Sequence, residues 1–353
     1  FIISFKMKSF YKRFSLFILP LLVFPLLYIL TDPFKVLYSY QNYYPNEFQI
    51  VQLNRDFVST NVFRDNYSSQ NYDSFIFGNS RSIFYEASLW GKQIHSHRIF
   101  HFDASGESLY GIYLKFFYLK NFNVQIKNCL LVLDNSTLGN SNKNDRGHLY
   151  IKSPYLSGDS FLEFHFSFFK AFLNIRFILG YIDYSIFKKF RWYMHGIFEE
   201  RNFDYDISSN ELKLSEFENQ IKAGTYKYHF QDSSIFHLSM RQIAVSKNIL
   251  THDAISKLFQ IKKIFDQDST NYKIILSPIY DQTHLSKHDL TVLKNIFGIK
   301  NVFDFSGDNF ITKDFHNFYE PSHYRPIVTK MILDSIYFQN NDKINNNYYI
   351  KGE

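Results

Sequence analysis

Residues 73–82 read DSFIFGNSRS, and the fold expected for the chain follows from this stretch. The run 74–77 is short, continuous and largely apolar, which is typical of a strand buried on both faces of a parallel sheet. A Gly-Asn-Ser turn follows at once, and parallel sheets bind their ligands at the carboxyl ends of their strands. We therefore expect Ser80 at that edge, at the start of the next helix, where free N–H groups favour negative charge.

Further short apolar runs repeat this pattern and alternate with helical patterns. The expected strands are 98–102, 129–133, 273–278 and 301–305, and the expected helices are 107–120, 251–266, 287–297 and 326–337. Strands that alternate with helices predict an α/β fold whose parallel sheet is covered on both faces. Residues 140–250 break the alternation and are expected to form a helical insertion.

Within the insertion, residues 161–183 read FLEFHFSFFKAFLNIRFILGYID. The four charged residues of this stretch fall six or seven positions apart, which places them on roughly one stripe of a single apolar helix. We expect a helix that is buried on most sides. The alternative is a helix that lies on a membrane surface or caps an acyl pocket.

The N-terminal region predicts a membrane anchor. Residues 14–31 contain no charge, and eighteen residues at about 1.5 Å each span roughly 27 Å, enough for a hydrocarbon core. The basic residues before the run (Lys6, Lys8, Lys12 and Arg13) predict a cytoplasmic N-terminus and an extracytoplasmic main domain. A cleaved signal peptide is one alternative, but it would need a small-x-small cleavage site, which residues 31–40, TDPFKVLYSY, do not offer. The other alternative is a helix buried in the protein core.

The expected organisation is therefore a basic flank and single-pass anchor (1–31), a linker and lead-in (32–72), an α/β domain (73–338) and a disordered tail (339–353). The 353 residues include 39 basic and 33 acidic ones, a net charge of +6, and a single cysteine. One cysteine excludes an intrachain disulfide and a multi-cysteine metal site. No basic-aromatic stripe indicates nucleic acid, and His95, His97 and His101 lack a neighbouring carboxylate, so we expect no metal or cofactor.

A second motif lies near the C-terminus, where residues 317–326 read NFYEPSHYRP. Glu320 stands three residues before His323, just ahead of the last expected helix. One short loop can then carry a base and the carboxylate that orients it, with the other ring nitrogen facing Ser80. In the alternative interpretation, Ser80 is only a helix N-cap and His323 is a loop histidine without a special role.

Together the two motifs resemble the SGNH/GDSL hydrolase superfamily, whose serine follows the first strand in a Gly-Asp-Ser type turn and whose Asp-x-x-His precedes the last helix. The Ser-Arg pair looks like the membrane-anchored extracytoplasmic branch, with relatives in alginate O-acetylation and teichoic-acid D-alanylation. The resemblance covers about residues 70–340 and implies a flavodoxin-like α/β/α sandwich. Asn79 and Glu320 replace the usual aspartates, and the family's Gly-x-Asn-Asp block is absent.

The resemblance also implies an oxyanion hole made by the Ser80 amide, Gly106 and Asn135. Asn135 has a plain alternative, since asparagine is common in turns. The longer Glu320 side chain shifts its carboxylate, so the upstream Asp314 or Asp308 is an alternative acid. Arg81 either steers an anionic substrate or forms a structural ion pair, and we expect the ion pair.

The expected function is serine-dependent ester hydrolysis or acyl transfer on an acylated cell-envelope glycan or similar ester. A transferase would need a membrane protein to deliver the acyl donor, because one span cannot carry it across. The rival hypothesis is an inactive scaffold that binds or assembles surface polysaccharide. A Ser80–His323 separation of about 3 Å on an open cleft would favour the enzyme.

Overall fold

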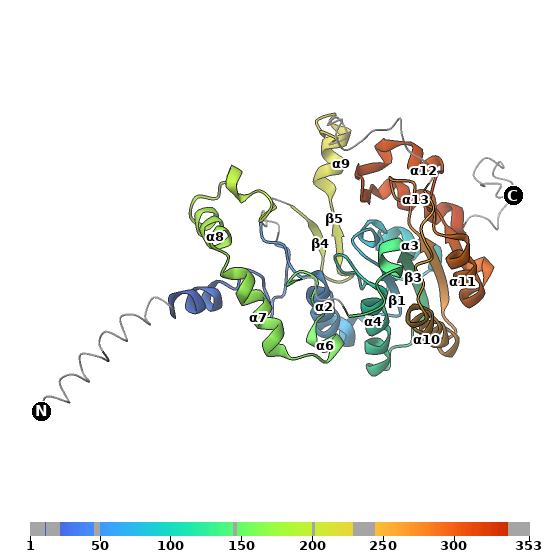
Figure 1. Cartoon of the computed structure of the whole chain (residues 1–353), viewed down its shortest axis with the longest axis horizontal. Helices are drawn as coiled ribbons and strands as arrows, with labels where there is room; N and C mark the ends of the chain where they lie inside the picture. The colour runs from blue at the N-terminus through green and yellow to red at the C-terminus, as the bar shows by residue number, and fades with distance from the viewer. Residues whose placement is uncertain are drawn as a thin grey trace, which may run out of the picture.

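A five-stranded parallel sheet forms the centre of the molecule (Figure 1). The structure, a computed structural model, describes residues 11, 22–45, 50–143, 147–199, 202–228 and 244–337. The sheet has the order β2-β1-β3-β6-β7, and all four neighbouring pairs are parallel. Its strands are β1 (Ser74–Phe77), β2 (Ile99–His101), β3 (Asn128–Leu133), β6 (Asn271–Leu276) and β7 (Val302–Asp304). The α/β fold expected from the sequence is confirmed.

Helices cover both faces of the sheet. Successive residues of a strand point to opposite faces, so each buried strand contributes side chains to the apolar cluster on either side. Phe75 and Phe77 of β1 pack in one apolar cluster, and Ile76 packs in the other. The first cluster includes side chains of α2 (Arg55–Gln70), α4 (Leu109–Asn121), α10 (His252–Asp268) and α11 (Lys287–Phe297). The second includes side chains of α3 (Ala87–Ile94) and α13 (Pro326–Tyr337).

The stretch 32–72 is not the linker that its polar composition suggested. It contains α2, and Phe63 of that helix is fully buried with its ring against Phe75 and Phe102. The first turn of α2 also buries Arg55 and Asp56, which are paired elsewhere in the chain. The buried side of α2 thus carries charged as well as apolar residues. For this reason its sequence shows almost no apolar periodicity.

The insertion differs from the expected single helix. It forms α7 (Phe161–Phe172) and α8 (Ile175–Phe187), because the Asn174 side chain accepts a hydrogen bond from Arg176 N and starts a new helix. Burial on most sides is also wrong, since Leu162 is 79% and Phe166 63% exposed. The insertion further contains α6 (Pro154–Ser157), the antiparallel pair β4 (Asp204–Asp206) and β5 (Glu211–Lys213), and α9 (Ser215–Lys222).

Residues 22–31 are helical and lie beside α7 at one end of the molecule (Figure 1). The Tyr28 ring contacts Phe169 and Phe172, with centroids 5.3 Å apart in both pairs. Within the described ranges, no helix combines the length and apolarity required to cross a bilayer. Residues 14–21 of the expected span, and the expected tail at 339–353, lie outside those ranges.

Candidate active site

Ser80 stands in the turn that leaves the carboxyl end of β1. Gly78 allows this turn, because a Cβ there would lie 2.7 Å from the carbonyl oxygen of Val132. Gly78 O also accepts a hydrogen bond from Ala104 N (3.2 Å), which ties the turn to the loop after β2. Ser80 does not begin an α-helix as expected: a short 3-10 turn, η1 (Ser82–Phe84), follows it. The serine therefore lacks an α-helix dipole behind it.

His323 and Glu320 lie on a small antiparallel hairpin directly before α13. Its strands are β8 (Phe318–Glu320) and β9 (His323–Tyr324), and Glu320 pairs with His323 across the turn. The Phe84 ring packs edge-on to the imidazole of His323, with centroids 6.1 Å apart. Thr329 Oγ1 of α13 donates to Phe84 O (2.8 Å), so the two ends of the domain are joined at the site.

Ser80, His323 and Glu320 form a continuous relay. Ser80 Oγ lies 2.8 Å from His323 Nε2, and His323 Nδ1 is bonded to Glu320 Oε1. Ser322 adds a hydroxyl donor to Glu320 Oε1 (2.5 Å). Burial alone would raise the pKa of Glu320, but the hydrogen bonds from His323 and Ser322 lower that pKa to about 2. Glu320 is therefore a carboxylate at neutral pH, able to hold the ring and to stabilise an imidazolium.

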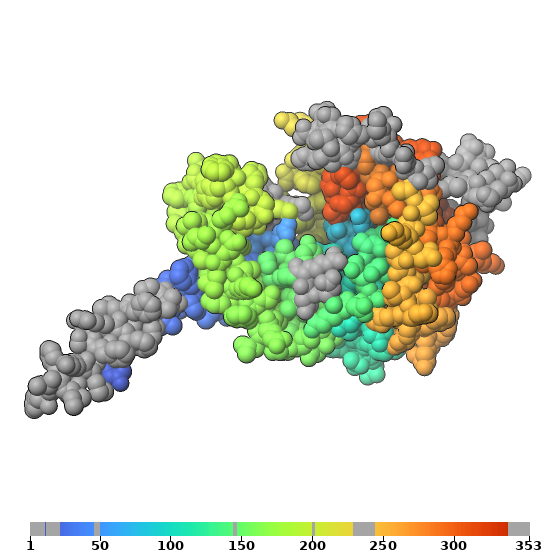
Figure 2. Space-filling view, viewed as in Figure 1, coloured from blue at the N-terminus to red at the C-terminus, as the bar shows by residue number. Residues whose placement is uncertain are grey.

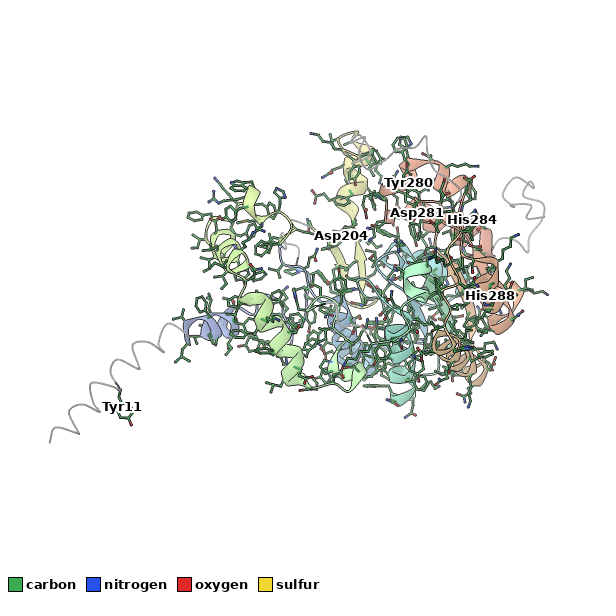
Figure 3. All side chains as sticks on the ribbon, viewed as in Figure 1. Tyr11, Asp204, Tyr280, Asp281, His284 and His288 are labelled. Atoms are coloured by element: carbon green, nitrogen blue, oxygen red, sulfur yellow. The ribbon has the colours of Figure 1, made fainter. Side chains whose placement is uncertain are left out.

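The alternative acids are bonded elsewhere. The exposed Asp314 carboxylate pairs with His316 at 2.8 Å. Asp308 pairs with Lys313 at 3.3 Å, and its backbone N–H donates to His284, which Figure 3 labels in the loop after β6. Neither aspartate contacts His323, so Glu320 occupies the orienting position despite its extra methylene.

Two of the three expected oxyanion donors are at the site. Gly106 lines the same pocket as Ser80 and His323. Its φ of +56° and the Tyr150 ring, which a Cβ would approach to 2.9 Å, both favour glycine there. The backbone N–H groups of Ser80 and Gly106 donate no hydrogen bond to the described part of the chain. Asn135 begins the short helix α5 (Asn135–Leu138) and is not among the pocket residues.

Arg81 forms the expected structural ion pair. Its guanidinium lies 2.5 Å from Asp134, which is almost fully buried after β3. The Asn79 side chain donates to the same carboxylate (2.5 Å) and to Thr137 Oγ1 (3.1 Å). Burial would raise the pKa of Asp134. The charge of Arg81 and the hydrogen bonds that Asp134 accepts outweigh burial and lower that pKa. Asn79 thus joins the turns after β1 and β3.

The relay opens onto a pocket of about 370 Å³. Figure 2 shows the surface hollowed between α7–α8 and the C-terminal elements. Sequence reasoning missed its polar floor, where Arg55 binds Asp103 through two hydrogen bonds of 2.9 Å and donates to Asn210. Burial would lower the pKa of Arg55, and Asp103 raises it. An arginine in a polar stretch gives no sign in sequence that it is buried.

A buried charge cluster behind Gly106 was also missed. Glu107, the next residue, lies 2.5 Å from the ammonium groups of both Lys115 and Lys152. Asp56 lies 3.3 Å and 3.5 Å from the same two groups. Burial would raise the pKa of Glu107, but the two lysines lower it to about 2. These four charges fix the chain immediately after Gly106.

The described residues contain no group of three or more His, Cys, Asp or Glu side chains arranged to hold a metal ion. His101 of β2 is fully buried, and burial lowers its pKa to about 4, so it stays neutral at physiological pH. The structure thus brings Ser80, His323, Glu320 and Gly106 to one pocket and leaves Asn135, Asp314 and Asp308 outside it. Comparison of the chain with protein-family models, with curated proteins and with solved structures finds no match.

Proposed function

We propose that this chain is a serine-dependent esterase or acyltransferase in which Ser80 is the nucleophile. One observation carries the proposal: Ser80 Oγ lies 2.8 Å from His323 Nε2, in a pocket with room for a small ester. In chain order, the sheet has the strand order 2-1-3-4-5, which supports the flavodoxin-like topology implied by the SGNH/GDSL resemblance.

Each residue has a defined role in the first half-reaction. His323 Nε2 takes the Ser80 proton as Oγ bonds to the ester carbonyl carbon, and Glu320 stabilises the imidazolium. The backbone N–H groups of Ser80 and Gly106 are the donors available to the oxyanion. The ester C–O bond then breaks, and His323 returns the proton to the departing alcohol. In the second half, water or a sugar hydroxyl attacks the acyl-serine and gives its proton to His323 Nε2. The Ser80 Oγ–acyl bond then breaks, and His323 returns that proton to Ser80 Oγ.

The substrate class is an ester on a cell-envelope glycan or a similar acylated molecule. Aromatic rings line much of the pocket, with the Arg55–Asp103 pair as a polar floor. The uncharged run 14–31 and its basic flank support a single-pass anchor with an extracytoplasmic catalytic domain. In the transferase case, a membrane protein partner would deliver the acyl donor to Ser80.

The test uses the full chain with p-nitrophenyl acetate and a fluorophosphonate probe. We expect labelling of the native protein and of Ser105→Ala, whose serine lines the same pocket. Ser80→Ala should lose both labelling and ester cleavage. Labelling that survives in Ser80→Ala would show that the nucleophile is another residue. A native protein that takes no label would support the inactive polysaccharide scaffold.

A further inference from the structure

Helices α7 and α8 each carry two apolar faces. The inner faces are explained by packing: Phe164, Phe168 and Phe172 of α7 are buried together with Phe177 and Ile178 of α8. This cluster is separate from the two that cover the sheet. The helix pair shares this small core with residues between positions 28 and 57 and with Met194 and Phe198. The core leaves the other apolar face of each helix exposed.

The outer faces form two apolar stripes. The spacing i, i+4, i+7, i+11 keeps residues on one side of a helix. The outer stripe of α7 and its end is Leu162, Phe166 and Leu173, exposed by 79%, 63% and 45%. The outer stripe of α8 is Ile175, Leu179, Ile182 and Ile186, exposed by 61%, 57%, 38% and 66%. Apolar side chains exposed in a row along two successive helices indicate a binding surface for a protein or a membrane.

The helical residues 22–31 extend this apolar surface. Tyr28 anchors the segment against α7, while Leu22, Leu26 and Leu30 are between 57% and 72% exposed. The segment belongs to the uncharged run 14–31. Figure 1 places it with α7 and α8 at the same end of the molecule, away from the sheet. The outer stripes thus lie next to the part of the chain best suited to lipid.

The charges around the stripes favour an anionic surface. Residues 161–192 contain five basic and only two acidic side chains. One of the acids, Asp183, is already paired with Arg191. Lys170, Arg176 and the Lys188–Lys189 pair are exposed, and Trp192 just after α8 is 83% exposed. Basic residues and tryptophan beside apolar surface are typical of contact with anionic lipid headgroups.

We propose that the outer stripes of α7 and α8 form a membrane-docking surface that lies in the headgroup region of an anionic bilayer. Amphipathic helices bind there by burying an apolar face while basic residues contact the headgroups. The pocket at Ser80 shares Val51, Gln52, Leu149 and Glu199 with a hollow of about 640 Å³ against α7. The surface does not depend on the proposed chemistry at Ser80.

The test introduces single cysteines into the full chain and reconstitutes it in anionic phosphatidylglycerol vesicles. Phe166→Cys and Leu179→Cys report on the outer stripes. Phe259→Cys and Ile299→Cys are matched controls, since these side chains are 57% and 71% exposed on the sheet domain. The native Cys129 is buried and will not react in the folded protein. Each variant carries an environment-sensitive nitrobenzoxadiazole label, and its melting curve verifies folding.

We expect the stripe labels to shift their emission to the blue and to be quenched by doxyl-labelled lipids, and the control labels to be quenched by aqueous iodide. Equal iodide quenching at all positions would overturn the proposal. Stripe labels shielded from iodide but untouched by doxyl lipids would also overturn it, because a protein or a second copy would then cover the stripes. Ile186→Cys replaces either stripe variant that fails to fold.

Discussion

Replacing Glu320 by glutamine removes the charge that orients His323 while it keeps the volume of the side chain. In the native protein, the carboxylate bonds His323 Nδ1 and accepts from Ser322 Oγ and Ser322 N. Against the raising effect of burial, these contacts lower the pKa of Glu320 from 4.5 to about 2. A glutamine can turn its amide N–H₂ toward the ring and cannot balance an imidazolium, so the transition state loses stabilisation.

The size of this loss follows from the pKa and from the exposure of the pair. A shift of this size corresponds to about 3 kcal/mol of preference for the charged form. The side chains of Glu320 and His323 are 36% and 31% exposed, so solvent screening reduces the usable part to about 1–2 kcal/mol. We therefore expect kcat/KM to fall by about 5- to 30-fold. Replacing the buried aspartate of a Ser-His-Asp triad by asparagine has a far larger effect and lowers kcat about 10⁴-fold.

The assay compares kcat/KM for p-nitrophenyl acetate, or the rate of fluorophosphonate labelling, in Glu320→Gln and Asp314→Asn. Asp314 is exposed and pairs with His316, so its variant should behave as the native protein. The depressed pKa of Glu320 also contributes stability above pH 4.5 that is lost as pH falls toward 2, and Glu320→Gln should lack this dependence. Full activity in Glu320→Gln, or an equal loss in Asp314→Asn, would refute the assigned relay.

Three further predictions concern stability. Asp103→Ala leaves the Arg55 charge buried without its carboxylate and should cost about 3–5 kcal/mol in chemical denaturation; a change under 1 kcal/mol would argue against a desolvated pair. Burial raises the pKa of Glu211 to about 7, so native stability should fall by up to about 3 kcal/mol between pH 4.5 and 7, and Glu211→Gln should flatten that curve. Gly78→Ala should destabilise by about 1–3 kcal/mol because its Cβ meets Val132 O, whereas an unchanged melting temperature would show that the turn can relax.

The sheet could be predicted because the signal for its strands lies within each short stretch of sequence. β3 contains the apolar run 129–133, β6 ends in the apolar run 274–276, and α13 begins at a proline, so each is visible without knowledge of its neighbours. The pairing of Ser80 with His323 was also predicted, from the turn after the first strand, the Glu-x-x-His spacing before the last helix and the resemblance of both to the SGNH/GDSL superfamily. Each of these signals is a short pattern that lies within about ten residues of the chain.

The missed features depend instead on partners far away in sequence. Arg55 meets Asp103 across 48 residues, and Lys152 meets Glu107 across 45, so neither residue looks buried in its own segment. The helix α2 was missed for the same reason, because Arg55 and Asp56 in its first turn are buried against distant partners. The break between α7 and α8 is different: Asn174 provides a local N-cap signal, and the apolar residues on both sides of it concealed that signal.

The relay and the wall of its pocket come from different parts of the chain. Ser80, Gly106 and His323 are placed by strand ends and by the hairpin before α13, which the sheet holds rigidly. Much of the wall comes from outside the sheet, including Tyr44 and Leu53 before α2 and Phe203 and Phe217 in the insertion. If Ser80 is the nucleophile as proposed, its chemistry depends on the α/β sheet, and the choice of ester depends on the segments inserted around that sheet. The same insertion carries the outer stripes, so recognition of the substrate and contact with the bilayer share one structural unit.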